Sequence, residues 1–186
     1  PINTVYLSRQ YNASNAVVGS DLSSMSGLID SETLTLSGST TMSSANVGTN
    51  SVNAASFTLG NGSNGGLANN YTVSGGSHTM TVTQRPLNAT LARQYDATTT
   101  SAGSTLSSFD ALQGGENLTM TGSGTAASKN VANGIAMSSN GNLALADGSG
   151  GTAGLASNYS LNSTVINISK RVLNSSGSKT YDANTN

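Results

Sequence analysis

Few side chains of this sequence could do chemistry, and they are scattered along it. The single histidine, His78, is not repeated as a histidine in the second copy of a repeat that the chain contains, so an exposed position at a strand end explains it better than a catalytic base or a metal ligand. Catalysis by paired carboxylates needs two acids held close together. The eight acids are Asp21, Asp30, Glu32, Asp96, Asp110, Glu116, Asp147 and Asp182. Only Asp30 and Glu32 are neighbours, so we expect no catalytic residue and no enzyme.

Two glycine-rich stretches are the remaining candidates for ligand binding. Residues 147–151 (Asp-Gly-Ser-Gly-Gly) resemble a calcium-binding turn, but Ca²⁺ takes about six to eight oxygen ligands, usually with several carboxylates. Residues 60–66 lack the lysine and the long helix that follow a phosphate-binding loop. Both stretches therefore indicate turns, and we expect no cofactor and no bound metal.

The composition excludes several further classes of site. Only 8% of the 186 residues are charged, the net charge is −1, and Ser, Thr, Asn and Gly together number 99. The absence of cysteine rules out disulfides and thiolate metal sites. No Lys/Arg cluster supplies the basic surface that nucleic acid binding needs. No apolar stretch reaches the length of about 18 residues typical of a membrane span, so we expect no membrane insertion of this segment.

An internal repeat organises the chain. Arg9-Gln10-Tyr11-Asn12-Ala13 recurs 84 residues later as Arg93-Gln94-Tyr95-Asp96-Ala97, and residues 34–39 match 118–123 at the same offset. Residues 67–71 match 155–159, and 84–88 match 170–174, with slips that fall in Gly/Asn/Ser loops. The repeat predicts a first module over residues 1–84, a second over 85–170 and the start of a third over 171–186. We therefore expect this chain to be part of a longer array.

Several tyrosine, aspartate and asparagine residues recur at fixed places in the repeat. Because recurrence is typical of structural positions, we expect the tyrosines to pack each module or its junction with the next module; carbohydrate stacking is the alternative. The motif residues are Tyr11, Tyr95, Tyr181, Tyr71, Tyr159, Asp96, Asp182, Asn46 and Asn130.

Short alternating runs of apolar and polar residues indicate strands with one buried face. They cover residues 33–36, 58–59, 71–73, 80–83, 118–121 and 164–168. Glycine-rich segments between these runs predict turns. In Leu22–Leu28, and in its counterpart Leu106–Leu112, apolar residues are about three apart. This spacing predicts a short helical turn in each copy.

Strands at short spacing predict an all-β fold of tandem small immunoglobulin-like β-sandwich modules, in which the tyrosine before a late strand is placed like a tyrosine corner. A β-grasp-like module and a parallel β-helix remain as alternatives. A β-helix would show rungs of about 20–29 residues, whereas this repeat is 84 residues long. Pro86 restricts φ between the modules and predicts an extended connection.

These motifs resemble the YDG/MBG repeats of large bacterial exoproteins, often filamentous-haemagglutinin-like proteins exported by two-partner secretion. Residues 95–99 (Tyr-Asp-Ala-Thr-Thr) match the family motif YDGTT. Residues 46–49 and 129–131 match parts of its KNVGT motif, and residues 70–71 and 158–159 match its late NY motif. The resemblance covers both copies and the start of the third.

The chain departs from the family motif at four positions. Alanine replaces the motif glycine at Ala13, Ala97 and Ala132, and Asn12 replaces the motif aspartate. These departures argue against a single fixed geometry of the motif turn.

The resemblance implies tandem β-rich modules in a secreted or surface-anchored bacterial adhesin that acts in attachment or biofilm formation, without catalytic residues. We expect an extracellular, cell-surface stalk or filament whose partners are the neighbouring repeats of the same chain. The alternative is that the repeats themselves bind glycan, a host protein or neighbouring filaments.

Overall fold

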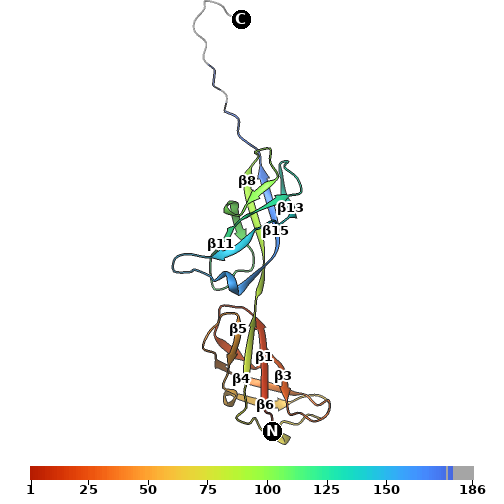
Figure 1. The fold of residues 1–186 in the computed structure, drawn as a ribbon. Helices are drawn as coiled ribbons and strands as arrows, with labels where there is room; N and C mark the ends of the chain where they lie inside the picture. Colours follow the sequence, from red (N-terminus) through yellow and green to blue (C-terminus); the bar gives the residue numbers. More distant parts are fainter. Residues whose placement is uncertain (175, 178–186) are drawn as a thin grey trace, which may run out of the picture.

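The computed structural model describes residues 1–174, 176 and 177, and these residues form two β modules placed end to end (Figure 1). Gln84 alone separates the last strand of the first module from the first strand of the second. The described residues contain strands and short 3-10 turns but no α-helix. The predicted all-β class is therefore confirmed.

The first module contains seven strands in two sheets. The strands are β1 (Thr4–Gln10), β2 (Ala16–Val18), β3 (Leu22–Ser26), β4 (Leu34–Thr41), β5 (Gly48–Ser51), β6 (Phe57–Asn61) and β7 (Thr79–Thr83). One sheet has the order β3-β1-β7-β5 and the other β2-β4-β6. The 3-10 turns are η1 (Gly19–Asp21), η2 (Ala54–Ser56) and η3 (Ala68–Asn70).

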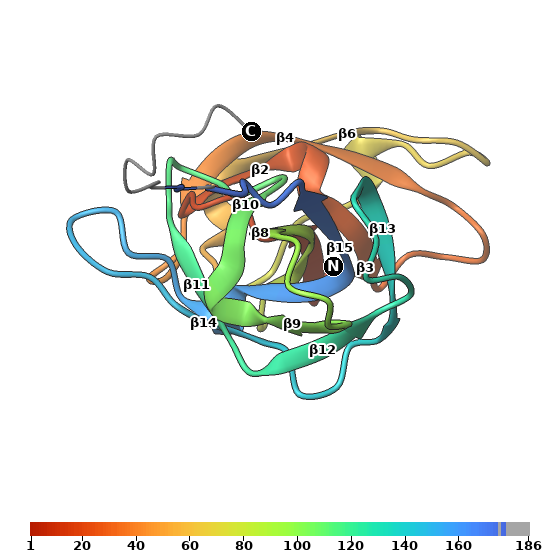
Figure 2. The same ribbon diagram turned by 90° about the horizontal axis from the view of Figure 1, so that it is seen from above.

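The second module repeats this plan with a more closed sheet. Its elements are β8 (Arg85–Gln94), β9 (Thr100–Ala102), η4 (Gly103–Thr105), β10 (Leu106–Phe109), β11 (Leu118–Thr121), β12 (Ser123–Ala126), β13 (Ala132–Ser139), β14 (Ala144–Asp147), η5 (Ala156–Asn158) and β15 (Tyr159–Ser169). The order β10-β8-β15-β13-β12-β9 stands beside the pair β11-β14. Pairing of β12 with β13 curls the sheet around the β8–β15 pair, which Figure 2 shows from above.

The first and last strands of each module are neighbours and run parallel. In the first module, β1 pairs with β7 from Tyr6 opposite Thr79 to Gln10 opposite Thr83. In the second, β8 pairs with β15 from Arg85 opposite Tyr159 to Gln94 opposite Ser169. Two parallel strands point the same way, so the chain enters a module at one end and leaves it at the other. The N-terminus accordingly lies at the end of the first module away from the second (Figure 1).

Alternating side chains of these strands build the two cores. In β4, Leu34 and Leu36 are buried while Thr35 between them is exposed, as the period of a strand requires. Met80 and Val82 of β7, and Ile166 and Ile168 of β15, follow the same rule. The first core cluster also includes Tyr11, Leu87, Leu118 and Tyr159. It therefore continues from the first module into the second.

The two predicted helical turns are wrong, because Leu22–Ser26 and Leu106–Phe109 are strands. Each strand has a register shift: Leu22 lies opposite Leu7 while Ser24 lies opposite Tyr6, and the pairing of β10 with β8 skips Ser107 in the same way. A β-bulge adds one residue to one strand. The extra residue turns the strand period of two into a spacing of three, which imitates a helix in the sequence.

The strand predicted over residues 71–73 is also wrong, because these residues form no strand. Val73 forms only an isolated parallel bridge with Ile2. At the corresponding place in the second module, β15 already begins at Tyr159. The same motif thus starts a long strand in one copy and an irregular segment in the other.

The finer prediction of immunoglobulin-like sandwiches is not confirmed. Such sandwiches consist of two antiparallel sheets, whereas here a parallel pair forms the centre of each module. The remaining strand pairs are antiparallel, and the two strands of each pair belong to the same module. They do not stack into the short rungs of a parallel β-helix.

His78 is buried, which corrects the prediction of an exposed residue. Its side chain is 8% exposed. The Val5 N–H donates to His78 Nδ1 at 3.1 Å, and His78 Nε2 lies 3.1 Å from the Ser74 carbonyl oxygen. Since Nδ1 accepts, Nε2 carries the proton and donates to Ser74. The imidazole therefore satisfies two backbone groups between β1 and the loop before β7.

We predict that His78→Ala lowers the free energy of unfolding by about 1–3 kcal/mol, because it leaves the buried Val5 N–H without an acceptor. Thr164 occupies the corresponding place in β15 and is the matched control. It is 5% exposed, and its hydroxyl has no hydrogen-bond partner within the described part of the chain. Thr164→Val should leave the free energy of unfolding unchanged or raise it. Urea denaturation measures both, and an equal loss in the two variants would contradict this role of His78.

Candidate functional site at the junction between the modules

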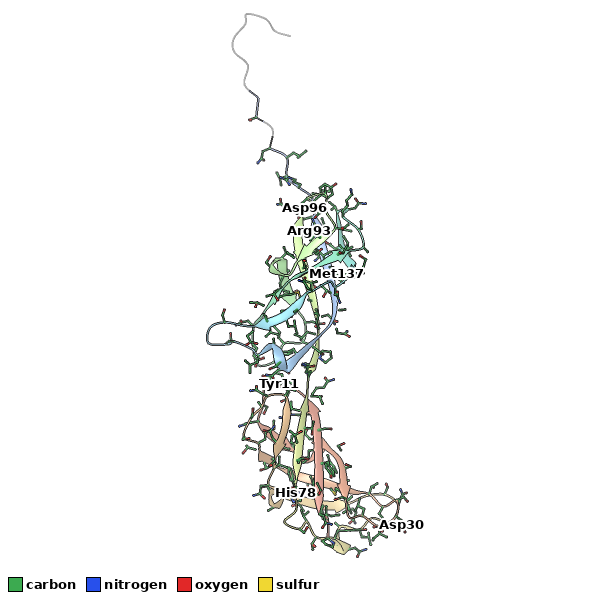
Figure 3. The ribbon with its side chains drawn as sticks, viewed as in Figure 1. Tyr11, Asp30, His78, Arg93, Asp96 and Met137 are labelled. Atoms are coloured by element: carbon green, nitrogen blue, oxygen red, sulfur yellow. The ribbon has the colours of Figure 1, made fainter. Side chains whose placement is uncertain are left out.

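The junction is formed by residues that flank the parallel strands of the two modules. Tyr11 follows β1, and Asn46 and Val47 precede β5, at the end of the first module that faces the second. From the second module come Glu116, which precedes β11, and Tyr159, the first residue of β15. Figure 3 shows Tyr11 between the two modules.

One carboxylate accepts a hydrogen bond from a tyrosine of each module. The Tyr11 hydroxyl donates to Glu116 Oε1 at 2.5 Å, and the Tyr159 hydroxyl donates to Glu116 Oε2 at 2.7 Å. The Gln113 N–H donates to the Tyr159 hydroxyl at 3.1 Å. Hydrogen bonds to a charged acceptor are stronger than neutral ones. Glu116 thus holds the two modules together through both of its oxygens.

The two tyrosine rings also pack against each other. Their centroids are 5.3 Å apart and their planes are inclined by 78°, which is an edge-to-face contact. Pairs of this geometry stabilise by about 0.5–1.5 kcal/mol beyond the area that they bury. Tyr11 is 3% exposed and Tyr159 is 2% exposed, so the contact excludes water.

Burial and the shared carboxylate change the acidity of both phenols. Burial, together with the Glu116 hydrogen bond, raises the pKa of Tyr159 to about 12. The same two causes, burial first, raise the pKa of Tyr11. The junction therefore favours neutral tyrosine hydroxyls that donate to Glu116.

Asn158 forms the second polar contact across the junction. Its Oδ1 accepts from the Val47 N–H at 2.9 Å, and its Nδ2 donates to Asn46 Oδ1 at 3.0 Å. Asn158 is 1% exposed, so its amide is satisfied by the first module instead of by water. The Asn46 N–H donates to Ser44 Oγ at 3.1 Å, which fixes the loop that receives Asn158.

The connection itself adds two hydrogen bonds to the second module. Gln84 Nε2 donates to the Ser157 carbonyl at 3.2 Å, and Arg85 Nε donates to the Ala111 carbonyl at 3.0 Å. Pro86 lies within β8, opposite Ser160, so the connection is extended as predicted. Leu87 is fully buried directly after it.

The motif turn has the same geometry in both copies, which corrects the expectation drawn from its alanines. Ala13 has a φ of 60° and Ala97 a φ of 67°, the left-handed conformation for which the family motif has glycine. The Ser14 N–H donates to Asn12 Oδ1 at 3.1 Å, and the Thr98 N–H donates to Asp96 Oδ1 at 3.0 Å. Asn12 and Asp96 therefore act alike in the turn.

An arginine braces each turn from the strand before it. Arg9 donates to the Ser14 carbonyl at 2.5 Å, and Arg93 donates to the Thr98 carbonyl at 2.7 Å. Arg9 also pairs with Asp21 at 3.2 Å, whereas Arg93 pairs with Asp96 inside the motif. Hydrogen bonds from the backbone and hydroxyl of Thr98, and then Arg93, lower the pKa of Asp96. The recurring aspartate is thus a structural residue of the turn.

The predicted motif residues fall into three groups. Tyr11, Asn46 and Tyr159 meet at the junction, while Tyr71 lies at the far end of the first module and contacts Glu32. Tyr95, Asp96 and Asn130 lie at the far end of the second module, where Figure 3 labels Asp96. Tyr181 and Asp182 are outside the described residues.

Tyr71 and Tyr159 resemble tyrosine corners only in part. Each hydroxyl accepts a backbone N–H, from Ile29 and Gln113 respectively, at 3.1 Å. These partners lie 42 and 46 residues upstream, whereas a tyrosine corner bonds to the backbone a few residues away.

Glu116 and Asn158 were not predicted as site residues from the sequence. A signal for Glu116 was present, since Glu32 precedes it by 84 residues and the two glutamates occupy one repeat position. Asn158 was noticed as part of a motif, but its role depends on Asn46 and Val47, more than 100 residues away.

The described residues contain no cluster of metal ligands and no helix that could span a membrane. Within them no three His, Asp or Glu side chains are grouped so that they could hold a metal ion. Asp147, considered above for calcium, accepts the Ala156 N–H at 2.7 Å and so braces its own glycine loop. No helix in the described part of the chain is long and apolar enough to cross a bilayer.

A family model matches both modules of the chain. The family model described as the YDG domain matches residues 2–81 and, a second time, residues 78–166. No match was found among the curated proteins or among the solved structures.

We predict that Glu116→Gln lowers the free energy of unfolding by about 1–3 kcal/mol, because a neutral amide cannot accept from both tyrosine hydroxyls. Glu32→Gln is the matched control, since Glu32 occupies the same repeat position and its carboxylate bonds only to Tyr71 among the described residues. Urea denaturation should show the larger loss for Glu116→Gln. Equal losses would mean that the contact across the junction contributes nothing.

We also predict that the junction weakens at alkaline pH. The pKa values of Tyr11 and Tyr159 are raised in the folded chain, so their contribution to stability is complete below the ordinary phenol pKa of about 10. It falls as the pH rises through 10 towards the pKa of about 12 of Tyr159. The free energy of unfolding of Tyr11→Phe should depend less on pH in this window than that of the unsubstituted chain. Identical slopes would contradict the assignment.

Proposed function

The chain belongs to the YDG domain family, and from this premise we propose that its modules are structural repeats in the stalk or filament of a bacterial adhesin. The adhesin would be secreted or anchored at the cell surface, as in filamentous-haemagglutinin-like proteins of two-partner secretion. Its modules would extend a binding region away from the cell for attachment or biofilm formation.

The parallel pairing of first and last strands supports this proposal most directly. A module that the chain enters at one end and leaves at the other adds its full length to an array. Gln84 alone connects the modules, so little chain is available for folding back.

The junction supports the same function by restricting how one module moves on the next. It combines the contacts of Glu116 with two tyrosines, the contacts of Asn158 with the opposite loop, and a core cluster that spans both modules. In repeat proteins, stability is roughly a sum of module and interface terms. A stiff joint keeps a distal tip at a distance from the surface, which is what a stalk requires.

The surface supports a passive role outside the cell. With 8% charged residues and no cysteine, the chain is nearly neutral and cannot be trapped by disulfides during export. Its acids take part in structural contacts: Asp21 pairs with Arg9, Asp96 with Arg93, and Asp110 accepts from Asn88 at 2.6 Å.

Small-angle X-ray scattering tests the stalk directly. The 186-residue chain should scatter as a rod. The double variant Glu116→Gln, Asn158→Ala should give a broader distribution of interatomic distances, because its modules are free to swing. The matched double variant Glu32→Gln, Asn70→Ala should scatter like the unsubstituted chain. A compact particle, or a junction variant that remains a rod, would contradict the proposal.

Antibodies against the chain test the location. They should label intact, unpermeabilised cells of the bacterium that produces it, or its culture medium. Labelling only after lysis would contradict an extracellular role. Binding of the isolated chain to a glycan array or to host proteins would favour the alternative, in which the repeats themselves bind a ligand.

A further inference from the structure

Tension along the chain reaches each module through its two parallel strands. A pull along the chain acts on the start of β1 and on the end of β7, because these are the first and last strands of the first module. Gln84 alone passes the tension on to the start of β8, and β15 carries it out of the second module. In Figure 1, β1, β8 and β15 run along the length of the molecule. The load therefore acts along these strands.

A parallel pair loaded in this way is sheared. Its two strands are drawn in opposite directions along their own length, and the evenly spaced hydrogen bonds between them run across that direction. All bonds of the pair then share the load. An antiparallel pair of first and last strands would instead be loaded at one end and would open one bond at a time. Each parallel pair, β1 with β7 and β8 with β15, is here called a clamp.

The clamp of the second module is long and shielded from water. β8 and β15 are matched over ten residue pairs, with one register shift. Leu87 and Leu91 of β8, and Ile166 and Ile168 of β15, are buried. These side chains exclude water from one face of the clamp, so water on that face cannot replace the hydrogen bonds when the strands begin to slide.

The clamp of the first module is shorter and is interrupted by a side chain. β1 and β7 are matched over only five residue pairs. Directly before them, the Val5 N–H donates to His78 Nδ1 at 3.1 Å, so an imidazole stands where the ladder would have a backbone carbonyl. The corresponding residues of the second module, Ala89 and Thr164, lie opposite each other within the ladder. The first clamp therefore spreads the same tension over fewer hydrogen bonds.

Neighbouring strands also support the second clamp more fully than the first. In the second module, β13 pairs with β15 and is itself held by β12. In the first module, β5 pairs with β7 but is the edge of its sheet, and the described residues show no pairing of β5 with β4. The strand beside the first clamp therefore lacks a support that its counterpart has.

We propose that the two clamps bear tension along the chain, and that the first clamp yields before the second. Unfolding of the first module releases residues 4–83 and lengthens the chain by roughly 250 Å while the second module stays folded. The chain thus resists a pull up to a limit and then extends, which caps the force on the contact that the stalk holds. This inference rests on the proposed stalk function and adds the bearing of tension to it.

Single-molecule force spectroscopy tests the two clamps. The 186-residue chain is held through one cysteine added at each end, which is selective because the chain has no native cysteine. Two unfolding events should appear, each with a lengthening of roughly 250 Å. Forced unfolding follows the unfolding rate. At the same force, the first module should unfold at least roughly ten times faster than the second, tenfold being the effect of about 1.4 kcal/mol. A single event for the whole chain, or equal rates, would overturn the proposed order.

Matched variants assign the events and test the clamp itself. Leu7 in β1 and Leu91 in β8 occupy one repeat position, and both are buried. Leu7→Ala should speed only the faster event, and Leu91→Ala only the slower one. Met120 is buried in the same core cluster as Leu91 but lies in β11, outside the clamp. Met120→Ala should speed the slower event far less than Leu91→Ala does, because contacts outside the clamp are still intact when the clamp gives way. Equal effects of these two variants would mean that the clamp does not resist the force.

A change in the direction of pull tests the second clamp without weakening its core. Gln94 ends β8 opposite Ser169, and Lys170 follows directly; Gln94 and Lys170 are both exposed. Handles on Gln94→Cys and Lys170→Cys load one end of the clamp, so its residue pairs open in turn. The second module should then unfold at least roughly ten times faster at the same force than when it is pulled end to end.

Equal rates in the two directions of pull would overturn the clamp. Such a result would leave the stalk function intact, because that function is tested by scattering from the chain without load. A compact particle in scattering would contradict the stalk and would leave the response of each module to force as measured.

Discussion

The parallel pairing of the first and last strands sets the direction in which the chain runs through each module. Because β1 lies beside β7 and points the same way, the chain enters the first module at one end and leaves it at the opposite end. The next module begins after a single residue and repeats the arrangement with β8 and β15. An antiparallel pairing of these strands would return the chain to its starting end and would fold an array back on itself.

The same pairing explains why two distant tyrosines meet. Tyr11 follows the first strand of one module, and Tyr159 begins the last strand of the next. Both positions therefore face the plane where the modules touch. Glu116, one of only eight acids in the chain, lies between them and accepts from both. In a molecule with so few charges, this carboxylate gives the junction a directional contact that apolar packing alone would not provide.

Local features of the fold could be predicted from the sequence, and long-range ones could not. Alternation of apolar and polar residues in 33–36, 80–83 and 164–168 predicted strands correctly. A strand with one buried face places an apolar residue at every second position. The β-bulges at Ser23 and Ser107 interrupt this alternation and space the apolar residues about three apart, as in a helix. Ala13 and Ala97 gave no sign of their positive φ, because alanine does not favour that conformation. His78 was misjudged because its partners, Val5 and Ser74, are defined only by the fold.

We propose that the parallel strands and the Glu116 junction join the two modules into one stiff unit. Residual dipolar couplings of backbone amides in weakly aligned solution measure this most directly. If the modules form one unit, a single alignment tensor should fit the amides of the β1–β7 pair and those of the β8–β15 pair. Two tensors of different magnitude or orientation would show that the modules move independently, and would contradict it.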